Sequence, residues 1–592
     1  MKAANRFAKN DGFVYTLWMN EHVNKYLSSS KVAALLFFIV IVCYSNSLQN
    51  GFVWDDNTII VRNDAIKEIS NVSGIVFAED TTEDMEHTGY YRPLTYLSYA
   101  IDYHLWGLKP AGFRAVNIFF HFISALILFH LAMLLFSDRL VSFFAAALFA
   151  AHPVHVESVT FIAARGSELS GFYYLLAFYF FVKFRSADPH GVVTGGLRGA
   201  YNKYKYLIFS SAAFITSFMA KEYAITLFLV MFAYDIAYLD RTKRIGMRSV
   251  LLSYVPYGLL TVCYFVARRI ATGGSHSVAS VADGIFGGGL LLRMVDAIRV
   301  VMRSIWTLIF PNALSVEYGF TPTDALLSIN LLVATVVFAL IIYYMYRQFM
   351  RNRALFVAIM LFLAPLTLTM GIIPLKGEAH LADRWLYIST AGFMLLIAYH
   401  MLSFINRVSV RNQKVLVVCL LFVAVLFSSY KTIERNRVFR DELSLWSDTV
   451  KKAPDSYKAH LNYGFALYKA GHHSRALSEY ERALILNPDS VKAQYNIAVY
   501  HQNRGEYELA EREYEDILSH GYSFFDLYFN LAECYEGSGD SVDALINYKK
   551  ALLETPNSLK TLTRLALIYY EQEDNASAMK YIELYESIKS SG

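Results

Sequence analysis

The first part of the chain alternates between long apolar segments and short polar ones. Each apolar segment runs for about 20 residues with few charges, and a helix of that length can cross a hydrocarbon layer about 30 Å thick. We therefore predict a helical membrane domain over residues 31–430, preceded by a polar tail at residues 1–30. The pattern predicts eleven spans, at residues 31–48, 113–136, 139–160, 168–184, 206–220, 222–239, 249–267, 325–346, 354–373, 384–405 and 414–430.

Residues 291–310 have a different pattern from these spans. Charged side chains recur there every three to four positions, at Arg293, Asp296, Arg299 and Arg303. A helix with this spacing has one charged and one apolar face, which is typical of a helix that lies in the membrane interface. We predict an interfacial helix at this place and no additional span.

Basic residues fix the predicted orientation of the domain. They gather in four of the loops, as Lys183, Arg185, Arg198, Lys203 and Lys205; Arg241, Lys243, Arg244 and Arg248; Arg347, Arg351 and Arg353; and Arg407, Arg411 and Lys414. Loops rich in lysine and arginine stay in the cytoplasm, so these loops and the N-terminal tail are predicted to be cytoplasmic. An odd number of spans then places loop 49–112 and everything after residue 430 on the opposite, outer face.

A repeat of 34 residues replaces the apolar segments after Lys431. It is typical of tetratricopeptide repeats, whose paired helices stack into an α-solenoid. We predict a connecting helix at residues 431–453 and repeats over residues 454–592, with the fourth repeat degenerate. The recurring positions are Gly471, Gly505 and Gly539; Ala476, Ala510, Ala544 and Ala578; Asn462, Asn496 and Asn530; Tyr480, Tyr514 and Tyr548; and Pro454, Pro488 and Pro556.

Composition agrees with a membrane domain. Of the 592 residues, 55% are hydrophobic and 16% aromatic, and the mean hydropathy is +0.32, whereas soluble domains average about 45–50% apolar residues. The four cysteines have no paired spacing that suggests a disulfide or a zinc site. The net charge of +4 adds little, because the placement of basic residues matters more than their sum. We expect no nucleic-acid partner.

The predicted outer loops contain an unusual number of ionisable residues next to the spans. Two adjacent carboxylates, Asp55 and Asp56, follow the first span. Charged groups at membrane depth are costly and commonly mark functional sites, so their concentration on one face favours an active site that opens outward. The others are Arg92, Asp102, His152, His155, Glu157, Arg165, Lys221, Glu222, Lys376, Glu378, His380, Asp383 and Arg384.

Several short motifs in this set occur in a recognisable order. They are WDD (54–56), YRPL (91–94), HPVHVES (152–158) followed by ARGSE (164–168), KE (221–222), FPNALSVEY (310–318) and DRWLY (383–387), with the repeats after them. In this order the chain resembles the transmembrane and tetratricopeptide-repeat O-mannosyltransferase family and its bacterial relatives. The resemblance runs through residues 31–592. It implies an all-α chain with a membrane domain of the GT-C glycosyltransferase fold.

The resemblance also implies an inverting transfer of a sugar, mannose or another hexose, from a polyprenyl- or dolichyl-phosphate carrier. An acidic residue in the first outer loop is then the catalytic base. One base suffices, because a lipid phosphate leaves without the protonation that a sugar alkoxide requires. The sequence leaves Asp55 and Asp56 open as the base, with Asp55 favoured. Arg384 is the first candidate to bind the lipid phosphate, and the further substrate-binding candidates are Arg92, Lys221, His155, Glu157 and Arg165.

Some of these residues have simpler interpretations. Asp55 and Asp56 can form a solvated turn, and Arg384 can anchor its span at the head groups beside Trp385. His152, His155 and Glu157 can be read as metal ligands, but their spacing differs from the H-E-x-x-H pattern of zinc helices. We therefore predict no metal site and no firm cofactor, although a divalent ion is compatible with the chemistry.

Two classes of function follow from these patterns. The first is a membrane glycosyltransferase whose partners are a lipid-linked sugar donor and a protein or peptide acceptor, a protein serine or threonine being favoured, which binds in the groove of the repeats. The second is a catalytically inert, membrane-anchored scaffold in which only the repeats act. A transporter is disfavoured, since polar residues are not spread through the middle of the spans. A bacterial inner membrane is favoured over the endoplasmic reticulum.

Overall fold

A computed structural model describes residues 28–68, 70, 72–77, 91–187, 196–239, 247–272, 290–318, 329–370, 382–405 and 411–591 of the chain. Every regular element in these ranges is a helix, as the predicted all-α class requires. The chain divides into two compact units, Met1–Leu445 and Trp446–Gly592. Most of the predicted tail at residues 1–30 lies outside the described residues.

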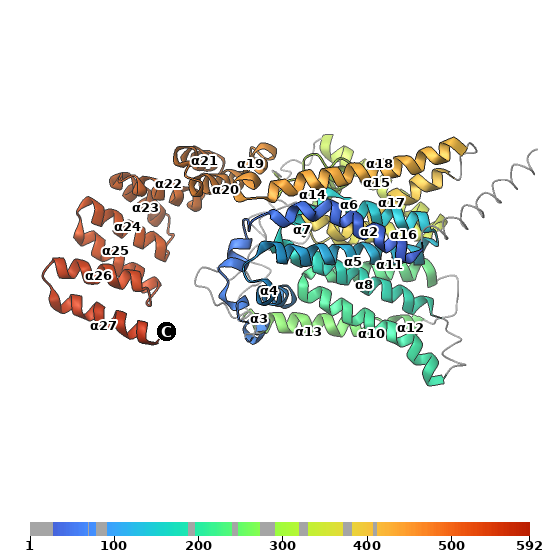
Figure 1. The fold of residues 1–592 in the computed structure, drawn as a ribbon, viewed down its shortest axis with the longest axis horizontal. Coiled ribbons are helices and arrows are strands. Elements are labelled where there is room, and N and C mark those ends of the chain that lie inside the picture. Colours follow the sequence, from blue (N-terminus) through green and yellow to red (C-terminus); the bar gives the residue numbers. More distant parts are fainter. Residues whose placement is uncertain are drawn as a thin grey trace, which may run out of the picture. The chain divides into compact units, whose positions relative to one another are not determined.

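The first unit is a bundle of helices (Figure 1). Each predicted span overlaps a helix of this unit. The helices are α2 (Ser29–Tyr44), α3 (Val72–Phe77), α4 (Pro93–Trp106), α5 (Pro110–Phe136), α6 (Arg139–Ala151), α7 (Val156–Val159), α8 (Arg165–Ser186), α10 (Gly196–Ala220), α11 (Leu227–Leu239), α12 (Met247–Leu252), α13 (Val255–Ala271), α14 (Leu290–Ile309), α15 (Ile329–Arg351), α16 (Arg353–Leu366), α17 (Tyr387–Ile405) and α18 (Arg411–Asn436).

Five helical stretches in the described residues are long and apolar enough to cross a membrane, or six if a bent pair counts as one span. The described part of the chain therefore has the helices of a membrane protein, while the number of eleven spans stays a prediction. The stretches are Ser29–Gln49, Pro110–Phe136, Val250–Ala271, Asp383–Phe404 and Val415–Phe439, and the bent pair is Arg139–Ala151 with Pro153–Val159.

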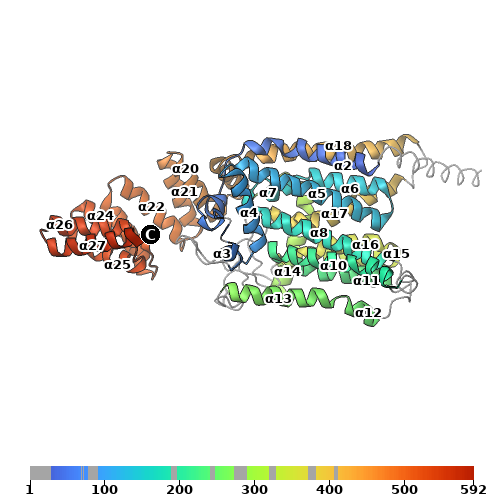
Figure 2. The same ribbon diagram turned by 60° about the horizontal axis from the view of Figure 1, so that its bottom comes forward.

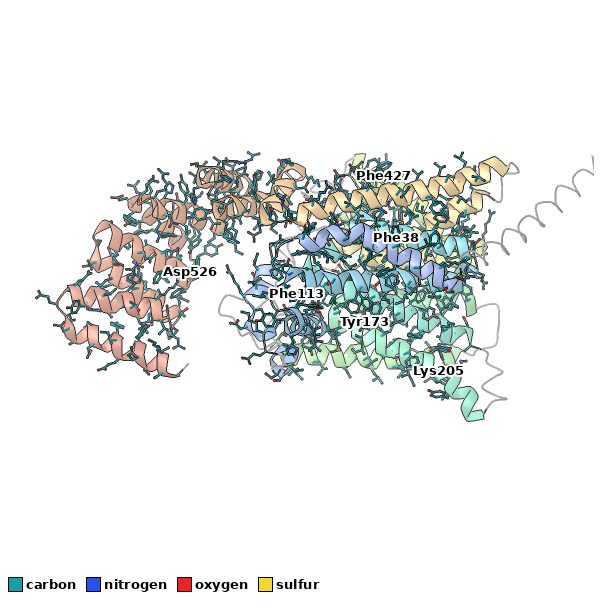
Figure 3. The ribbon with its side chains drawn as sticks, viewed as in Figure 1. Phe38, Phe113, Tyr173, Lys205, Phe427 and Asp526 are labelled. Atoms are coloured by element: carbon teal, nitrogen blue, oxygen red, sulfur yellow. The ribbon has the colours of Figure 1, made fainter. Side chains whose placement is uncertain are left out.

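The long helices of the bundle run side by side (Figures 1 and 2). Helices α3 and α4 lie at one end of the bundle and α12 at the other. Apolar side chains cover the outside of the bundle, and Phe38 on α2 and Phe427 on α18 are 64% and 49% exposed (Figure 3). An aromatic surface of this kind suits contact with lipid tails. Lys205, from a predicted cytoplasmic loop, lies at the end opposite Phe113.

Helix α14 corresponds to the predicted interfacial helix. It is absent from the membrane-spanning candidates among the described helices. One face packs into the bundle through Val300, Ser304 and Leu308, while Trp306 on another face is 58% exposed. The helix is thus amphipathic, as its sequence predicts, and its position relative to the membrane stays a prediction.

A break between α6 and α7 positions part of the site. Helix α6 ends at Ala151, and a short 3-10 turn, η4 (Pro153–His155), leads into α7. Proline cannot supply the amide hydrogen that a continuing helix needs, and the two halves meet at 47°. The His152 side chain caps the new turn by accepting a hydrogen bond from the Val154 amide at 3.2 Å.

The second unit consists of paired helices. Helix α19 (Glu442–Lys452) contains the unit boundary, so the predicted connecting helix at 431–453 consists of the end of α18, a 3-10 turn η9 (Arg437–Phe439) and α19. The pairs are α20 (Tyr457–Lys469) with α21 (His473–Leu486), α22 (Val491–Asn503) with α23 (Tyr507–Ser519), α24 (Phe525–Ser538) with α25 (Ser541–Glu554), and α26 (Leu559–Glu571) with α27 (Asn575–Ser591).

The recurring residues of the repeat have structural positions. The column alanines and tyrosines are almost completely buried between the helices. Gly471, Gly505 and Gly539 have φ of 81°, 74° and 90°, a left-handed conformation that glycine adopts without steric cost. In the degenerate fourth repeat Glu573 stands at the glycine position and still has a φ of 61°.

Replacing Gly464 by alanine should destabilise the first repeat. A methyl group at this position on α20 would lie 2.6 Å from the ring of Tyr480, a buried column residue. Overpacking of this kind costs about 1–3 kcal/mol. The midpoint of thermal unfolding of the full chain should fall for Gly464→Ala and stay unchanged for Ser478→Ala, an exposed position on α21. Equal midpoints for the two variants would contradict the packing described here.

Candidate active site

The two adjacent aspartates lie in a tight turn that begins at Val53 and ends at Asp56. Trp54 has a φ of 50°, a strained conformation for a residue with a side chain. The turn is closed because the Asp56 amide donates to the Val53 carbonyl at 3.0 Å, and the Val53 amide donates to Asp56 Oδ2 at 3.1 Å. Asp56 is consequently fully buried, whereas Asp55 is partly exposed.

Asp56 is bound by the protein itself. Its Oδ1 accepts a hydrogen bond from the Ala163 amide at 2.7 Å, in addition to the Val53 amide on Oδ2. Burial raises the pKa of Asp56 to about 7, although the neighbouring Arg114 and the two backbone donors act in the opposite direction. These contacts give Asp56 a structural role, because they tie the loop to the segment that follows α7.

Asp55 has charged neighbours instead of backbone donors to its side chain. Its carboxylate is close enough to Arg384 and Glu157 for both to influence its charge. Burial raises the pKa of Asp55, Arg384 lowers it and Glu157 raises it, and the net direction is upward. A carboxylate with a raised pKa in such a setting is a stronger base than an ordinary aspartate.

Arg384 is held in a fixed orientation by Glu157. Arg384 begins a late span in the 3-10 turn η8 (Asp383–Leu386), and Glu157 is buried on α7. The Arg384 amide donates to Glu157 Oε2 at 2.9 Å, and its guanidinium pairs with the other carboxylate oxygen. The guanidinium also lies over the ring of Trp54, 5.8 Å from its centroid.

Lys221 and the ion pair between Arg92 and Glu222 lie near Asp55, Glu157 and Arg384. Lys221 follows α10, and its ammonium donates to Ser167 Oγ at 2.8 Å. Arg92 pairs with Glu222 at 3.1 Å. The electrostatic neighbours of Lys221 include Arg92, Glu222, Arg384 and Glu157, so the two ion pairs and the lysine share one site. We call Asp55, Glu157, Lys221, Arg384, Arg92 and Glu222 the charged cluster.

Arg165 does not join the charged cluster. It is completely buried at the start of α8 and forms an ion pair with Asp102 of α4 at 2.5 Å. It also donates hydrogen bonds to Asn117 Oδ1 at 2.6 Å and to the Phe113 carbonyl at 2.8 Å. With these partners its guanidinium ties α4 and α5 to α8.

His155 is likewise enclosed by other side chains. Its ring packs against those of His121, Phe149 and Tyr387, with centroids 5.1, 4.4 and 4.8 Å apart. In the described residues its nitrogens have no hydrogen-bond partner. No described group of three histidine, cysteine or acidic residues is placed to hold a metal ion. His152 hydrogen-bonds instead to the Leu308 carbonyl at 3.0 Å. Lys376, Glu378 and His380 lie outside the described residues.

Arg114 was not predicted from the sequence. Its guanidinium binds backbone carbonyls at the beginning of the loop that contains Asp55. Arg114 is fully buried near the start of α5, donates to the Thr160 carbonyl at 2.9 Å and the Gly51 carbonyl at 2.5 Å, and also contacts the Asn50 carbonyl. A single arginine inside the apolar stretch at 113–136 was the available signal.

The chain is similar in sequence to known proteins along most of its length. A family model described as tetratricopeptide repeat matches residues 440–491, 465–518 and 495–559. Protein O-mannosyl-transferase TMTC1 of Homo sapiens is 25% identical over 496 residues, which cover 78% of this chain and 55% of that protein. The chain resembles protein O-mannosyl-transferases. The resemblance predicted from the motifs is therefore confirmed, and so is the presence of tetratricopeptide repeats.

Other relatives show the same degree of similarity. Protein O-mannosyl-transferase TMTC3 of Mus musculus is 25% identical over 484 residues, covering 76% of this chain and 51% of that protein. TMTC4 of Homo sapiens is 24% identical over 504 residues, covering 75% and 64%. The chain spans about half the length of the first of the curated relatives it matches. Among solved structures, MamA from Desulfovibrio magneticus RS-1 is 19% identical with a TM-score of 0.24, covering 25% of this chain and 84% of that one.

Proposed function

We propose that the chain is an inverting membrane glycosyltransferase. It moves mannose, or another hexose, from a polyprenyl- or dolichyl-phosphate carrier to a serine or threonine hydroxyl of a protein. The reaction takes place on the membrane face opposite the basic loops, in a bacterial inner membrane in preference to the endoplasmic reticulum. The observation that carries the proposal is the contrast between the aspartates: Asp56 is bound by backbone amides, whereas Asp55 interacts electrostatically with Arg384 and Glu157 of the charged cluster.

Asp55 acts as the general base in this proposal. Its carboxylate takes the proton of the acceptor hydroxyl while the hydroxyl oxygen attacks the anomeric carbon of the sugar. The bond between that carbon and the phosphate oxygen breaks, and the bonding electrons leave with the lipid phosphate. One displacement from the opposite face inverts the anomeric configuration. The proton ends on Asp55 and the additional negative charge on the phosphate.

The cations stabilise this growing charge, and they do not contribute equally. Arg384 and Arg92 are already neutralised by Glu157 and Glu222. Within the described ranges no carboxylate lies at ion-pair distance from Lys221, whose ammonium is bound by the neutral Ser167 hydroxyl. Lys221 is therefore proposed to meet the charge of the phosphate, and Arg384 and Arg92 orient the phosphate through directed hydrogen bonds. On this ground we propose Lys221 as the first phosphate ligand, whereas the sequence places Arg384 first.

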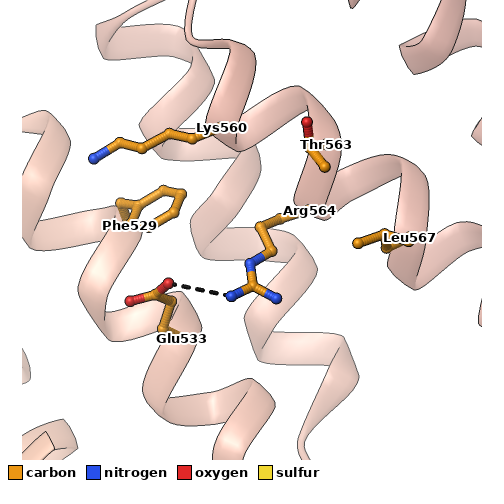
Figure 4. Close-up of a pocket in the computed structure, with 6 residues that line it drawn as sticks. All are labelled: Phe529, Glu533, Lys560, Thr563, Arg564 and Leu567. Carbon is orange, nitrogen blue, oxygen red and sulfur yellow. Dashed lines mark ion pairs between the residues drawn. The ribbon is translucent and has the colours of Figure 1, made fainter. Parts of the chain in front are cut away.

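The repeats bind the acceptor polypeptide in this proposal. Taken by itself, the second unit has a pocket of about 420 Å³ between α24 and α26 (Figure 4). The Lys560 ammonium lies over the ring of Phe529, 4.3 Å from its centroid, and Arg564 pairs with Glu533 at 3.5 Å. Aromatic side chains and arginine, here Phe529 and Arg564, are enriched at surfaces that bind other polypeptides.

Purified full chain and labelled polyprenyl-phosphate mannose test the proposal. We expect release of lipid phosphate together with transfer of mannose to an acceptor polypeptide, and a product whose anomeric configuration is opposite to that of the donor. Donors with other hexoses identify the sugar. Retention of configuration would contradict the single displacement. If none of the hexose donors reacted, the chain would be better described as a membrane-anchored scaffold.

The pH dependence of the reaction follows from the raised pKa of Asp55. A general base acts only when it is deprotonated, so kcat should rise with pH and level off above the pKa of Asp55. Because burial raises that pKa, the rise should lie above the usual aspartate value of about 3.9. The measurement is kcat for lipid-phosphate release across the acidic range. A rate that is constant from about pH 4 upward, the usual range for an exposed carboxylate, would exclude Asp55 as the titrating base.

A further inference from the structure

The loop that contains Asp55 is attached to a segment almost 400 positions away in the sequence. This segment, residues 436–442, consists of the end of α18, the turn η9 and the start of α19, and we call it the connector. It belongs to the first unit, which ends at Leu445, and the chain continues from it into the repeats. The proposed chemistry of the charged cluster does not use it.

Hydrogen bonds join the connector to the beginning of the loop and to the end of α2. The Gly51 amide donates to the Arg440 carbonyl at 3.0 Å. The Asn50 side chain donates to the Asn436 carbonyl at 2.8 Å, and the Asn436 side chain donates to the Cys43 carbonyl at 2.7 Å. The two bonds made by the asparagine side chains are buried, so they are not exchanged readily for bonds to water.

Two aromatic contacts link the connector to Trp54, the residue with the left-handed conformation. The ring of Phe439, fully buried in η9, lies 6.2 Å from that of Phe161. Phe161 in turn stacks on Trp54, with centroids 5.4 Å apart and an interplanar angle of 8°. The left-handed conformation of Trp54, the residue before Asp55, persists only because surrounding contacts hold it.

Asn57 links the turn directly to the connector. Its side-chain amide donates to Glu442 Oε1 at 2.7 Å and, over a longer distance of 3.3 Å, to the Trp54 carbonyl. Its backbone amide also donates to the Trp54 carbonyl at 3.1 Å. One side chain therefore touches both the residue that precedes Asp55 and the first residue of α19.

We propose that Asn57 and Glu442 are positioning residues for Asp55, so that the connector sets the activity of the charged cluster. The inference rests on the proposed function, since Asp55 is the group that is positioned. Neither residue belongs to the charged cluster. Displacement of a catalytic group by about 1 Å can lower a rate by about 100-fold, and loss of the hydrogen bond between Asn57 and Glu442 would permit such a displacement of the loop.

Reversing the polarity of the hydrogen bond tests the proposal in the full chain. Asn57→Asp places two carboxylates together, and we expect kcat to fall by about 10- to 100-fold while the KM for the donor changes little. In Asn57→Asp combined with Glu442→Gln, the glutamine amide can donate to the new aspartate. This double variant should recover kcat to within about threefold of wild type, as coupled partners do in a mutant cycle. Glu442→Ala, which introduces no charge, should lower kcat in the same direction.

Hydrogen exchange separates this inference from the proposed function. Without any donor, amide exchange in residues 51–61 should increase in Asn57→Asp and return to the wild-type rate in the double variant. Glu434→Gln is the matched control, because Glu434 is an exposed carboxylate of α18 that pairs with Lys431 at 2.8 Å. That control should change neither exchange nor kcat.

The outcomes are distinct. Recovery of both kcat and exchange in the double variant supports the positioning role. Faster exchange in Asn57→Asp with a wild-type kcat overturns it, and so does failure of the double variant to recover. If wild type consumes no donor, the proposed function fails, and unchanged exchange in Asn57→Asp then also overturns the link between loop and connector.

Discussion

Replacing Asp55 by asparagine is expected to lower kcat for sugar transfer by about 10²- to 10⁴-fold, the contribution typical of a general base. Asparagine has nearly the same shape and cannot accept the acceptor proton. Because the Asp55 side chain is partly exposed and forms no backbone hydrogen bond in the described structure, the variant should fold like wild type. The measurement is the rate of labelled lipid-phosphate release at saturating donor.

Asp55→Glu is the matched control for this prediction. It keeps a carboxylate on a side chain that is one methylene longer, so part of the activity should remain and the dependence on pH should persist. In Asp55→Asn the remaining kcat should no longer rise with pH across the acidic range, which is the acidic limb of the pH profile. A variant that keeps wild-type kcat with the limb intact would show that the base lies elsewhere.

The second large effect is expected at Lys221. Lys221→Met keeps most of the length of the side chain and removes its charge, and we expect kcat to fall by about 10²- to 10³-fold, as for other groups that stabilise charge in a transition state. The donor KM should rise less than kcat falls, because the negative charge on the phosphate grows as the bond to the sugar breaks. Steady-state kinetics with labelled donor measures both constants.

Two comparisons make the Lys221 prediction specific. Ser167→Ala removes the hydroxyl that holds the ammonium at 2.8 Å and leaves the charge, so its effect should be much smaller. Arg384→Met should also lower kcat. It removes the ion-pair partner of the buried Glu157 carboxylate and should therefore destabilise the fold as well. If Lys221→Met stays within about threefold of wild type, less than 1 kcal/mol on the barrier, the phosphate is bound by other cations.

The architecture was predictable where the sequence has a regular pattern, either apolar segments of constant length or the 34-residue repeat. Apolar segments of span length become helices of the first unit, and the 34-residue columns become buried contacts between paired helices, because both depend on residues close together in the chain. Even the degenerate repeat follows this logic, with Glu573 in the left-handed position that glycine occupies in the other repeats. Local pattern and tertiary structure agree at these places.

The different surroundings of Asp55 and Asp56 were not predictable from the sequence. They depend on the left-handed turn at Trp54 and on an amide at Ala163, more than a hundred positions later. The same holds for Arg165, whose motif placed it among the substrate-binding candidates. Its partner Asp102 lies on α4, and only the packing of α4 against the start of α8 brings the two together. Contacts between distant segments have no linear signature.

The most direct test compares wild type, Asp55→Asn and Asp56→Asn in one assay, with purified full chain and labelled polyprenyl-phosphate mannose. We predict that wild type transfers mannose and that Asp55→Asn folds but does not. Asp56→Asn should unfold at a lower temperature and keep measurable transfer, because its carboxylate serves the loop and not the acceptor. Transfer by Asp55→Asn at the wild-type rate, with none by a folded Asp56→Asn, would contradict the account.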